Sequence, residues 1–338
     1  MRAIPALAHA VLVSADPAPN AILDTAPNQV RLLLTEPVAP AFSHISVFAQ
    51  SGQQVDNGDL KSDSDDGTAL VVTLPPITDG TYLVSWEVLS AVDGHTTRGS
   101  YPFGVGVGQL TSAPGSASST AQRPTLFSTG ARWFNLTGQA LLLGLFTFRL
   151  FVWNPAFRSI ELAQADEGLE YAFGRTSLKV ALVGLALVVL GLVFTLIAQS
   201  ARIDLLNLDN LGTWLGTQFG SLWLVRFFVT AAVGFAMGDL YVGLERGRDG
   251  LRGWEWWAAL GVVIGLSLTT PFVGHSAALS EDRQQAIAVD ALHVLAAGVW
   301  VGGLLQLALG LWLGRSSSPN LRAWFNLSLA LNFSALAA

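Results

Sequence analysis

The sequence has no cysteine, and only two of its 338 residues are methionine, Met1 and Met237. The absence of cysteine excludes disulfides, zinc knuckles and metal sites built on thiolates. Because no methionine occurs between Met1 and Met237, a cluster of thioether ligands is excluded from this long stretch as well. A transition-metal site there can use only nitrogen and oxygen ligands.

Charged residues are also scarce. They make up 12% of the sequence, against 51% hydrophobic residues, and the mean hydropathy is +0.48. This composition is typical of an integral membrane protein that carries a soluble part. A phosphate-binding loop is absent from the sequence, so nothing in this chain supports transport driven directly by ATP.

Basic side chains are rare in the amino-terminal part. Between His9 and Val107, eleven aspartates and glutamates are opposed only by Arg31, Lys61 and Arg98. An acidic surface of this kind disfavours nucleic acid as a partner and favours solubility or the attraction of cations.

Residues 9–107 contain short segments of β-branched and aromatic residues, separated by proline, glycine, asparagine and aspartate. We predict strands at 30–34, 45–48, 69–74, 82–88 and 101–105. Several such strands in about a hundred residues predict an all-β sandwich. The acidic run 63–67 is interpreted as a solvated hairpin turn, because it lacks the glutamate and the spacing of an EF-hand calcium loop.

Residues 108–124 are rich in serine, alanine, glycine and proline, and we interpret them as a flexible linker. The remainder, 125–338, is predicted to be an all-α membrane domain with several spans. Five apolar segments are long enough to cross a bilayer, at about 127–153, 178–199, 221–243, 254–273 and 289–314. A sixth begins near Ala323 and reaches Ala338, too short to cross, so we expect the membrane domain to continue further.

Basic residues are divided unevenly between the two sets of loops. One set holds Arg158, Arg175, Lys179, Arg246, Arg248, Arg252, Arg315 and Arg322. The other set holds only Arg202 and Arg283. By the positive-inside rule, the first set faces the cytoplasm. Residues 9–107 are then expected outside the cytoplasmic membrane, with His275 and His293 near the same outer face.

The stretch 90–99 places a carboxylate and an imidazole two residues apart at the end of a predicted strand. In extended chain, Asp93 and His95 project to the same side, and Gly94 relaxes the backbone between them. Both side chains can therefore address one metal ion. The alternative is an ordinary surface turn, because Asp-Gly is a common turn pair.

His9 offers further ligands to the same ion. It follows Ala6-Leu7-Ala8, a sequence of the kind that signal peptidase cuts behind, so residues 1–8 are interpreted as a residual signal segment. Because this segment is too short for a secretory signal, we expect the start to be mis-assigned or truncated. Cleavage would give His9 a free amine beside its ring nitrogen. With Asp93 and His95, these donors form a planar nitrogen and oxygen set, which suits Cu(II).

Several motifs of the first domain occur together: His9-Ala10, Val13-Ser14-Ala15-Asp16-Pro17-Ala18-Pro19, Glu36-Pro37-Val38, Gly80-Thr81-Tyr82, Val84-Ser85-Trp86 and Asp93-Gly94-His95, with Gly99 and Phe103. They resemble the periplasmic copper-binding CopC family. Further on stand Gly274-His275-Ser276-Ala277-Ala278, Asp290-Ala291-Leu292-His293 and Trp300-Val301-Gly302-Gly303-Leu304, which resemble the membrane protein CopD. The resemblance implies a CopC–CopD fusion whose first domain is a Greek-key sandwich.

CopC proteins can also carry a methionine-rich Cu(I) site. This sequence lacks the methionines for it, so the resemblance implies a domain that binds only Cu(II). His44 lies roughly where such a site would fall, and we interpret it as a strand residue.

In the membrane part, Asp290 and His293 are three residues apart and share one helical face, with His275 one short loop away. Ionisable residues at membrane depth are costly and usually face a cavity or a partner. The alternative is that all three lie in the interfacial zone. By resemblance to CopD, the two histidines would help to carry copper onward.

Other polar and small residues of the spans have simpler interpretations. Gly298 and Gly302 form a pair typical of helix packing. Arg226 lies near one end of the third span, where its side chain is expected to snorkel to the interface. Asn135 and Gln139 could line a path.

We therefore expect a bacterial cell-envelope protein that binds Cu(II) outside the cytoplasmic membrane and passes copper to its own membrane domain for import. Its expected partners are the copper ion and the lipid bilayer, and the protein that donates or accepts copper stays open. It is not expected to be an enzyme. Copper oxidases also use an amino-terminal histidine, but here Asp93 adds an anionic donor that opposes reduction to Cu(I).

Two other functions remain open. One is a membrane redox protein with haem between His275 and His293. The other is a copper sequestration or sensing module in which the helices serve only as an anchor.

Overall fold

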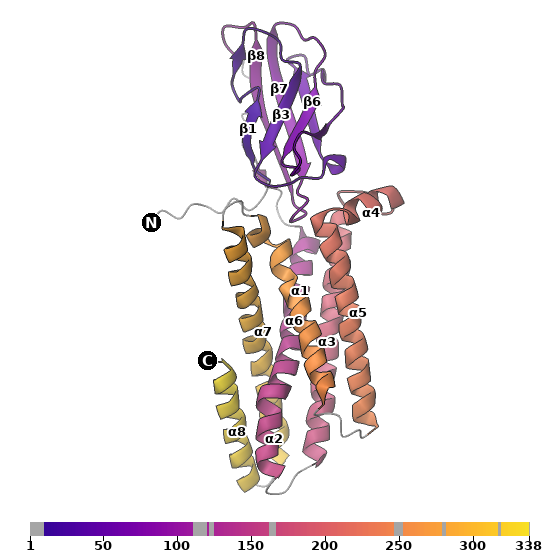
Figure 1. Ribbon diagram of the computed structural model, residues 1–338, viewed down its shortest axis with the longest axis vertical. Coiled ribbons are helices and arrows are strands. Elements are labelled where there is room, and N and C mark those ends of the chain that lie inside the picture. Colours follow the sequence, from indigo (N-terminus) through magenta and orange to yellow (C-terminus); the bar gives the residue numbers. More distant parts are fainter. Residues whose placement is uncertain are drawn as a thin grey trace, which may run out of the picture. The chain divides into compact units, whose positions relative to one another are not determined.

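The computed structural model describes residues 10–110, 120–121, 125–161, 167–246, 253–278, 282–316 and 319–337. The chain falls into two compact units (Figure 1). The first unit comprises Met1–Pro124 together with Arg202–Leu222 and Pro271–Ala288, and the second comprises the remaining helical segments. The interpretation of residues 1–8 as a signal segment and of His9 as a ligand concerns residues outside the described ranges.

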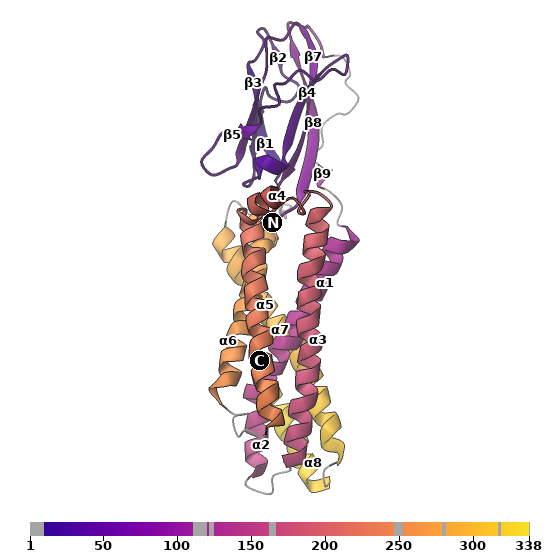
Figure 2. The same ribbon diagram turned by 90° about the vertical axis from the view of Figure 1, so that its right-hand side faces the viewer.

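Two sheets form the sandwich, and Figure 2 shows them as two layers. The first sheet has the order β1 (Leu12–Asp16), β3 (Gln29–Leu34), β6 (Ala69–Thr73) and β5 (Lys61–Ser62). The second has the order β2 (Ile22–Leu23), β8 (Thr96–Val105), β7 (Gly80–Leu89) and β4 (His44–Ala49), with β9 (Thr120–Ala121) paired to β8. The predicted all-β sandwich is confirmed, and each of the five predicted strands overlaps an observed one.

The sheets contain both predicted and unpredicted strand residues. His44 is the first residue of β4, opposite Glu87 of β7, so its interpretation as a strand residue is confirmed. The short strands β1, β2 and β5 were not among the predicted ones. Within the stretch interpreted as a linker, β9 pairs with Thr97 and Arg98 of β8.

The core of the sandwich follows the alternation of its strands. In β3, Val30, Leu32 and Leu34 are buried, while the residues between them are less so. The same alternation in β7 buries Val84 and Trp86 against the facing sheet. All fully buried members of this core lie between residues 10 and 105. The sandwich therefore has a complete hydrophobic core of its own, as expected of a domain that folds independently.

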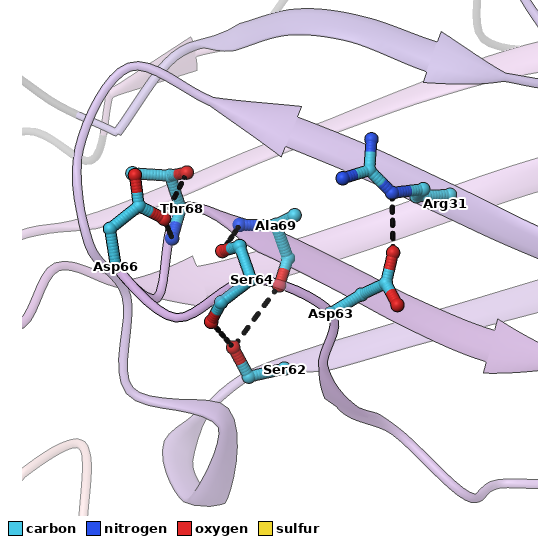
Figure 3. A network of polar contacts seen from close by, with 7 residues as sticks. All are labelled: Arg31, Ser62, Asp63, Ser64, Asp66, Thr68 and Ala69. Carbon is cyan, nitrogen blue, oxygen red and sulfur yellow. Dashed lines mark hydrogen bonds and ion pairs between the residues drawn. The ribbon is translucent and has the colours of Figure 1, made fainter.

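The acidic run 63–67 is the turn between β5 and β6 (Figure 3). Arg31 Nε donates to Asp63 Oδ2 at 2.5 Å. The hydroxyl and the backbone N–H of Thr68 donate to Asp66 Oδ1 at 2.7 and 3.0 Å, and these hydrogen bonds lower the pKa of Asp66 to about 2. The carboxylates thus stabilise the turn, and the hairpin interpretation is confirmed.

The long helices run side by side in Figures 1 and 2. The helical elements that follow the sandwich, long and short, are in chain order α1 (Leu126–Phe148), the π-helical turn η2 (Arg149–Trp153), α2 (Asn154–Glu161), α3 (Glu167–Ser200), α4 (Leu208–Leu215), α5 (Gln218–Glu245), α6 (Trp254–Leu268), η4 (Thr270–Val273), η5 (His275–Ala278), α7 (Arg283–Leu313), η6 (Gly314–Ser316) and α8 (Pro319–Ala337). Among the described residues, five segments are long and apolar enough to cross a membrane: Leu126–Phe157, Gly168–Ser200, Gln218–Glu245, Trp254–Val273 and Arg283–Leu313. The predicted five spans are confirmed, and the apolar helix Asn326–Ala337 is shorter.

Glycines bring α1 and α7 into direct backbone contact. A Cβ atom on Gly302 would lie 1.9 Å from the carbonyl oxygen of Ala140, and one on Gly144 would lie 2.1 Å from the carbonyl carbon of Gly302. A Cβ on Gly298 would lie 2.6 Å from Leu143 Cδ1. Gly298 and Gly302 therefore serve helix packing, as the sequence pattern indicated.

Polar side chains inside the helical unit pair with one another. Arg226 is only 7% exposed, and its Nη2 donates to Asn135 Oδ1 at 3.0 Å, so the expectation that it snorkels is wrong. Gln139 Oε1 accepts a hydrogen bond from Thr270 Oγ1 at 3.1 Å. Arg226 and Gln139 thus each gain a partner that the surrounding hydrocarbon side chains cannot offer.

Candidate metal centre

A tight turn joins β7 to β8 and carries the predicted ligands. Ser90 Oγ accepts hydrogen bonds from the backbone N–H groups of Val92 and Asp93 at 3.1 and 3.0 Å. The N–H of Ser90 in turn donates to the carbonyl oxygen of His95 at 2.9 Å. Gly94 has a φ of +69°, in the left-handed region that favours glycine. The turn is therefore fixed at both ends and strained for any other residue at position 94.

This turn brings Asp93 and His95 together as predicted, although the backbone between them is a turn and not the extended chain on which the prediction was based. Asp93 Oδ1 accepts a hydrogen bond from the N–H of His95 at 2.9 Å, and Asp93 Oδ2 lies 3.2 Å from His95 Nδ1. The Asp93 side chain is 1% exposed and the His95 side chain 22% exposed. An anionic oxygen and an imidazole nitrogen thus lie side by side, with part of the His95 ring exposed to solvent, and this pair of donors fits a divalent transition-metal ion.

The start of the sandwich is anchored beside the same turn. The hydroxyl of Thr97 donates to the carbonyl oxygen of Ala10 at 2.6 Å, and Ala10 is fully buried. The N–H of Val11 donates to Thr35 Oγ1 at 3.0 Å. Thr97 follows His95 by two residues, so the first described residue of the chain is bound close to the predicted ligands.

Glu36 is a buried carboxylate at this site that the analysis of ligand spacing missed. It is 3% exposed, and burial together with the charge of Asp93 raises the pKa of Glu36 to about 8. In the sequence it stands in Glu36-Pro37-Val38, directly after a strand and far from residue 93. A single acidic residue at a strand end does not indicate by itself which distant loop it meets.

We expect Glu36→Gln to stabilise the copper-free sandwich at about pH 8 and much less at about pH 5. The folded-state pKa of about 8 exceeds the ordinary value of 4.5, so the folded state keeps a proton that the unfolded chain releases. Stability consequently falls as the pH rises between these two values, by an amount on the order of a few kcal/mol. Glutamine has no proton to lose and removes this dependence.

Urea unfolding of the isolated sandwich at both pH values measures the effect. Glu87→Gln, which changes an exposed carboxylate of β7, is the matched control and should keep the wild-type dependence on pH. A Glu36→Gln variant whose stability falls with rising pH as steeply as that of the wild type would contradict the raised pKa of Glu36.

The protein-family model of the CopC domain matches residues 12–106 of the sequence. The family model of the copper resistance protein D-like N-terminal domain matches residues 123–285. Protein YobA of Escherichia coli K12 is 36% identical over 99 residues, which are 29% of this chain and 79% of YobA. The first domain belongs to the CopC family, and a copper resistance protein D-like domain follows it, so the chain is a CopC–CopD fusion.

The CopC–CopD fusion also has a relative that spans both of its parts. Copper transport protein CutJ of Bacillus subtilis is 27% identical over 314 residues, which are 88% of this chain and 52% of CutJ. The chain therefore spans about half the length of this relative. Both halves of the fusion are members of copper resistance and transport families, in agreement with the resemblance seen in the sequence.

Two solved structures are similar to the CopC part of the fusion. CopC from Methylosinus trichosporium OB3b is 33% identical, covers 31% of this chain and all of its own, and has a TM-score of 0.28. PcoC from Escherichia coli, described as a methionine-rich copper resistance protein, is 27% identical. The match covers 29% of this chain and 98% of PcoC, with a TM-score of 0.25. Neither of the chain's two methionines lies between residues 12 and 106.

The predicted site residues of the membrane part are divided between the two compact units. Asp290 is half-buried and His293 exposed on α7, in the second compact unit. The backbone of His275 begins η5, in the first unit. Among the described residues, no group of three or more histidine, cysteine, aspartate or glutamate side chains could hold a metal ion. Asp93 and His95 form a pair, and the third predicted ligand, His9, lies outside those residues.

Proposed function

We propose that this CopC–CopD fusion captures Cu(II) outside the cytoplasmic membrane through His9, Asp93 and His95. The observation that carries the proposal is the turn that holds Asp93 Oδ2 3.2 Å from His95 Nδ1. The anchoring of Ala10 by Thr97 supports the inclusion of His9, because His9 is covalently joined to Ala10. Together these residues supply an amine, two imidazoles and one carboxylate.

The chemistry of these donors favours Cu(II) as the cargo. Imidazole suits copper among the divalent metals, and copper stands highest in their affinity order. The Asp93 carboxylate is a hard anionic ligand that stabilises Cu(II) against reduction, and the CopC part has no methionine to hold Cu(I). The site is therefore suited to capture and release of Cu(II) rather than to redox catalysis.

The membrane part is the proposed recipient of the copper. The distribution of basic residues supports a sandwich on the outer face of the membrane, and covalent linkage raises the effective concentration of the loaded donor at its acceptor. His275, Asp290 and His293 are the proposed residues of the entry route. Capture on the outside is useful upstream of uptake, so import is the direction that we propose, as a contribution to copper homeostasis and resistance.

The amino terminus provides the test. We expect a sandwich that begins at His9 with a free amine to bind one Cu(II) tightly, with nitrogen couplings in its electron paramagnetic resonance spectrum. A version with one alanine before His9 loses the amine from the site, and we expect its affinity to fall about a hundredfold, or ~2.7 kcal/mol. Competition with a chromophoric chelator measures both dissociation constants. Equal affinities would remove His9 from the site.

A further inference from the structure

The first compact unit includes more than the sandwich. Two segments that connect the membrane-crossing helices, Arg202–Leu222 and Pro271–Ala288, belong to it as well. The guanidinium of Arg202 donates through Nη1 to the carbonyl oxygen of Gly94 at 2.9 Å. The backbone N–H of Phe219 donates to the carbonyl oxygen of Ala91 at 2.9 Å. Both acceptors belong to the turn that carries Asp93 and His95.

The contacting segment has a defined local structure. Within it, α4 is capped by Asn207, whose side chain accepts hydrogen bonds from Asp209 and Asn210 at its start. The ring of Trp214 is buried and packs edge-on against Phe219, with 6.1 Å between the ring centroids. The N–H of Phe219 is thus presented by the first turn of α5, beside a buried ring, as a specific docking contact requires.

Charge complementarity accompanies these hydrogen bonds. Burial lowers the pKa of Arg202, while the neighbouring carboxylates of Asp93 and Glu87 act to raise it. The second basic residue of the outer loops, Arg283, interacts electrostatically with Glu36. The two arginines that the sequence assigns to the outer loops therefore both lie in the field of the acidic sandwich, at its metal-binding end.

We propose that Arg202 and the backbone of Phe219 form a latch that docks the metal-binding turn, and that the docked turn binds Cu(II) more weakly than the released turn. The inference rests on the proposed function. Arg202 places a positive charge beside Asp93, the carboxylate that the copper ion needs, so the guanidinium and the metal compete for the same negative charge. The latch also fixes the carbonyl of Gly94, between the two ligands.

Linkage makes the coupling reciprocal. If docking weakens Cu(II) binding by some factor, Cu(II) must weaken docking by the same factor. The loaded turn is then released and the empty turn is held. In this scheme, docking of a loaded sandwich lowers its affinity at the point where copper is to be handed over, and the segment 202–222 acts as the receiving surface.

The dissociation constant for Cu(II) tests the latch. The samples are the isolated sandwich beginning at His9 and, in nanodiscs, the full chain beginning at His9 and its Arg202→Gln variant. We expect the full chain to bind Cu(II) about tenfold more weakly than the sandwich, a modest factor because Arg202 is only partly buried and its charge is screened. Arg202→Gln should recover most of that difference. Lys61→Gln removes an exposed cation of β5 and should leave the affinity of the full chain unchanged.

Hydrogen exchange provides a second readout. We expect Cu(II) to accelerate amide exchange at Phe219 in the wild-type chain, and Arg202→Gln to accelerate it without copper. Equal Cu(II) affinities of the wild-type and Arg202→Gln chains, with exchange at Phe219 unaffected by copper, would overturn the latch while leaving the capture site intact. Failure of the isolated sandwich to bind Cu(II) would instead overturn the proposed function, and the latch with it.

Discussion

His95→Ala is expected to lower the Cu(II) affinity of the isolated sandwich about a thousandfold, or ~4 kcal/mol. The substitution removes an imidazole ligand and leaves Asp93 without the nitrogen that lies 3.2 Å from its Oδ2. The carboxylate would remain almost fully buried, with its charge balanced by fewer partners. Loss of one ligand from a set of four also opens a coordination position to water. The remaining donors are therefore expected to hold copper only weakly.

His44→Ala is the matched control for this prediction. His44 is exposed at the start of β4, opposite Glu87, and is not among the proposed ligands. Its removal should leave the dissociation constant unchanged, as measured by chelator competition. Circular dichroism of both variants would show that the sandwich still folds. A similar loss of affinity in both variants would mean that copper binds to surface histidines without a defined site.

The sequence predicted those features that depend on neighbouring residues. The sequence predicted that Asp93 and His95 lie together, and the structure shows this, but through a turn in which Gly94 has a φ of +69° and not through extended chain. The five spans depend only on the length and hydropathy of continuous segments. The hairpin at 63–67 follows from short polar side chains that bond to their own backbone, as Asp66 does with Thr68.

The features that could not be predicted depend on residues far apart in the chain. The bond between Thr97 and Ala10 joins residues 87 positions apart, and that between Arg202 and Gly94 joins residues 108 apart. The hydrophobic periodicity of a single segment does not indicate such contacts. Arg226 shows the same limit, because its position near a helix end suggested snorkelling, whereas its burial depends on Asn135 of another helix. Whether a polar residue is exposed or paired is decided by packing, which a single segment does not encode.

Packing of the helices leads to the second prediction. We expect Gly302→Ala to destabilise the helical unit by about 3 kcal/mol. A Cβ atom at this position would lie 1.9 Å from the carbonyl oxygen of Ala140 and 2.8 Å from Gly144 Cα. Both are backbone atoms, so the clash is relieved only if α1 and α7 move apart. Separation would also disturb the other close contact of the pair, between Gly298 and Leu143.

Gly261→Ala in α6 gives the opposite expectation. A Cβ there meets no atom within 4 Å, and alanine is favoured over glycine in a helix interior by about 1 kcal/mol. Thermal unfolding of the purified chain can be followed by tryptophan fluorescence. The midpoint temperature of the Gly302→Ala variant should be lower than that of the wild type by roughly 5 to 10 °C. Gly261→Ala should unfold at or above the wild-type temperature. If the unfolding temperatures of the two variants fell equally, the loss of stability would reflect a general effect of replacing glycine in these helices. The close approach of α1 and α7 would then not be what stabilises the membrane part.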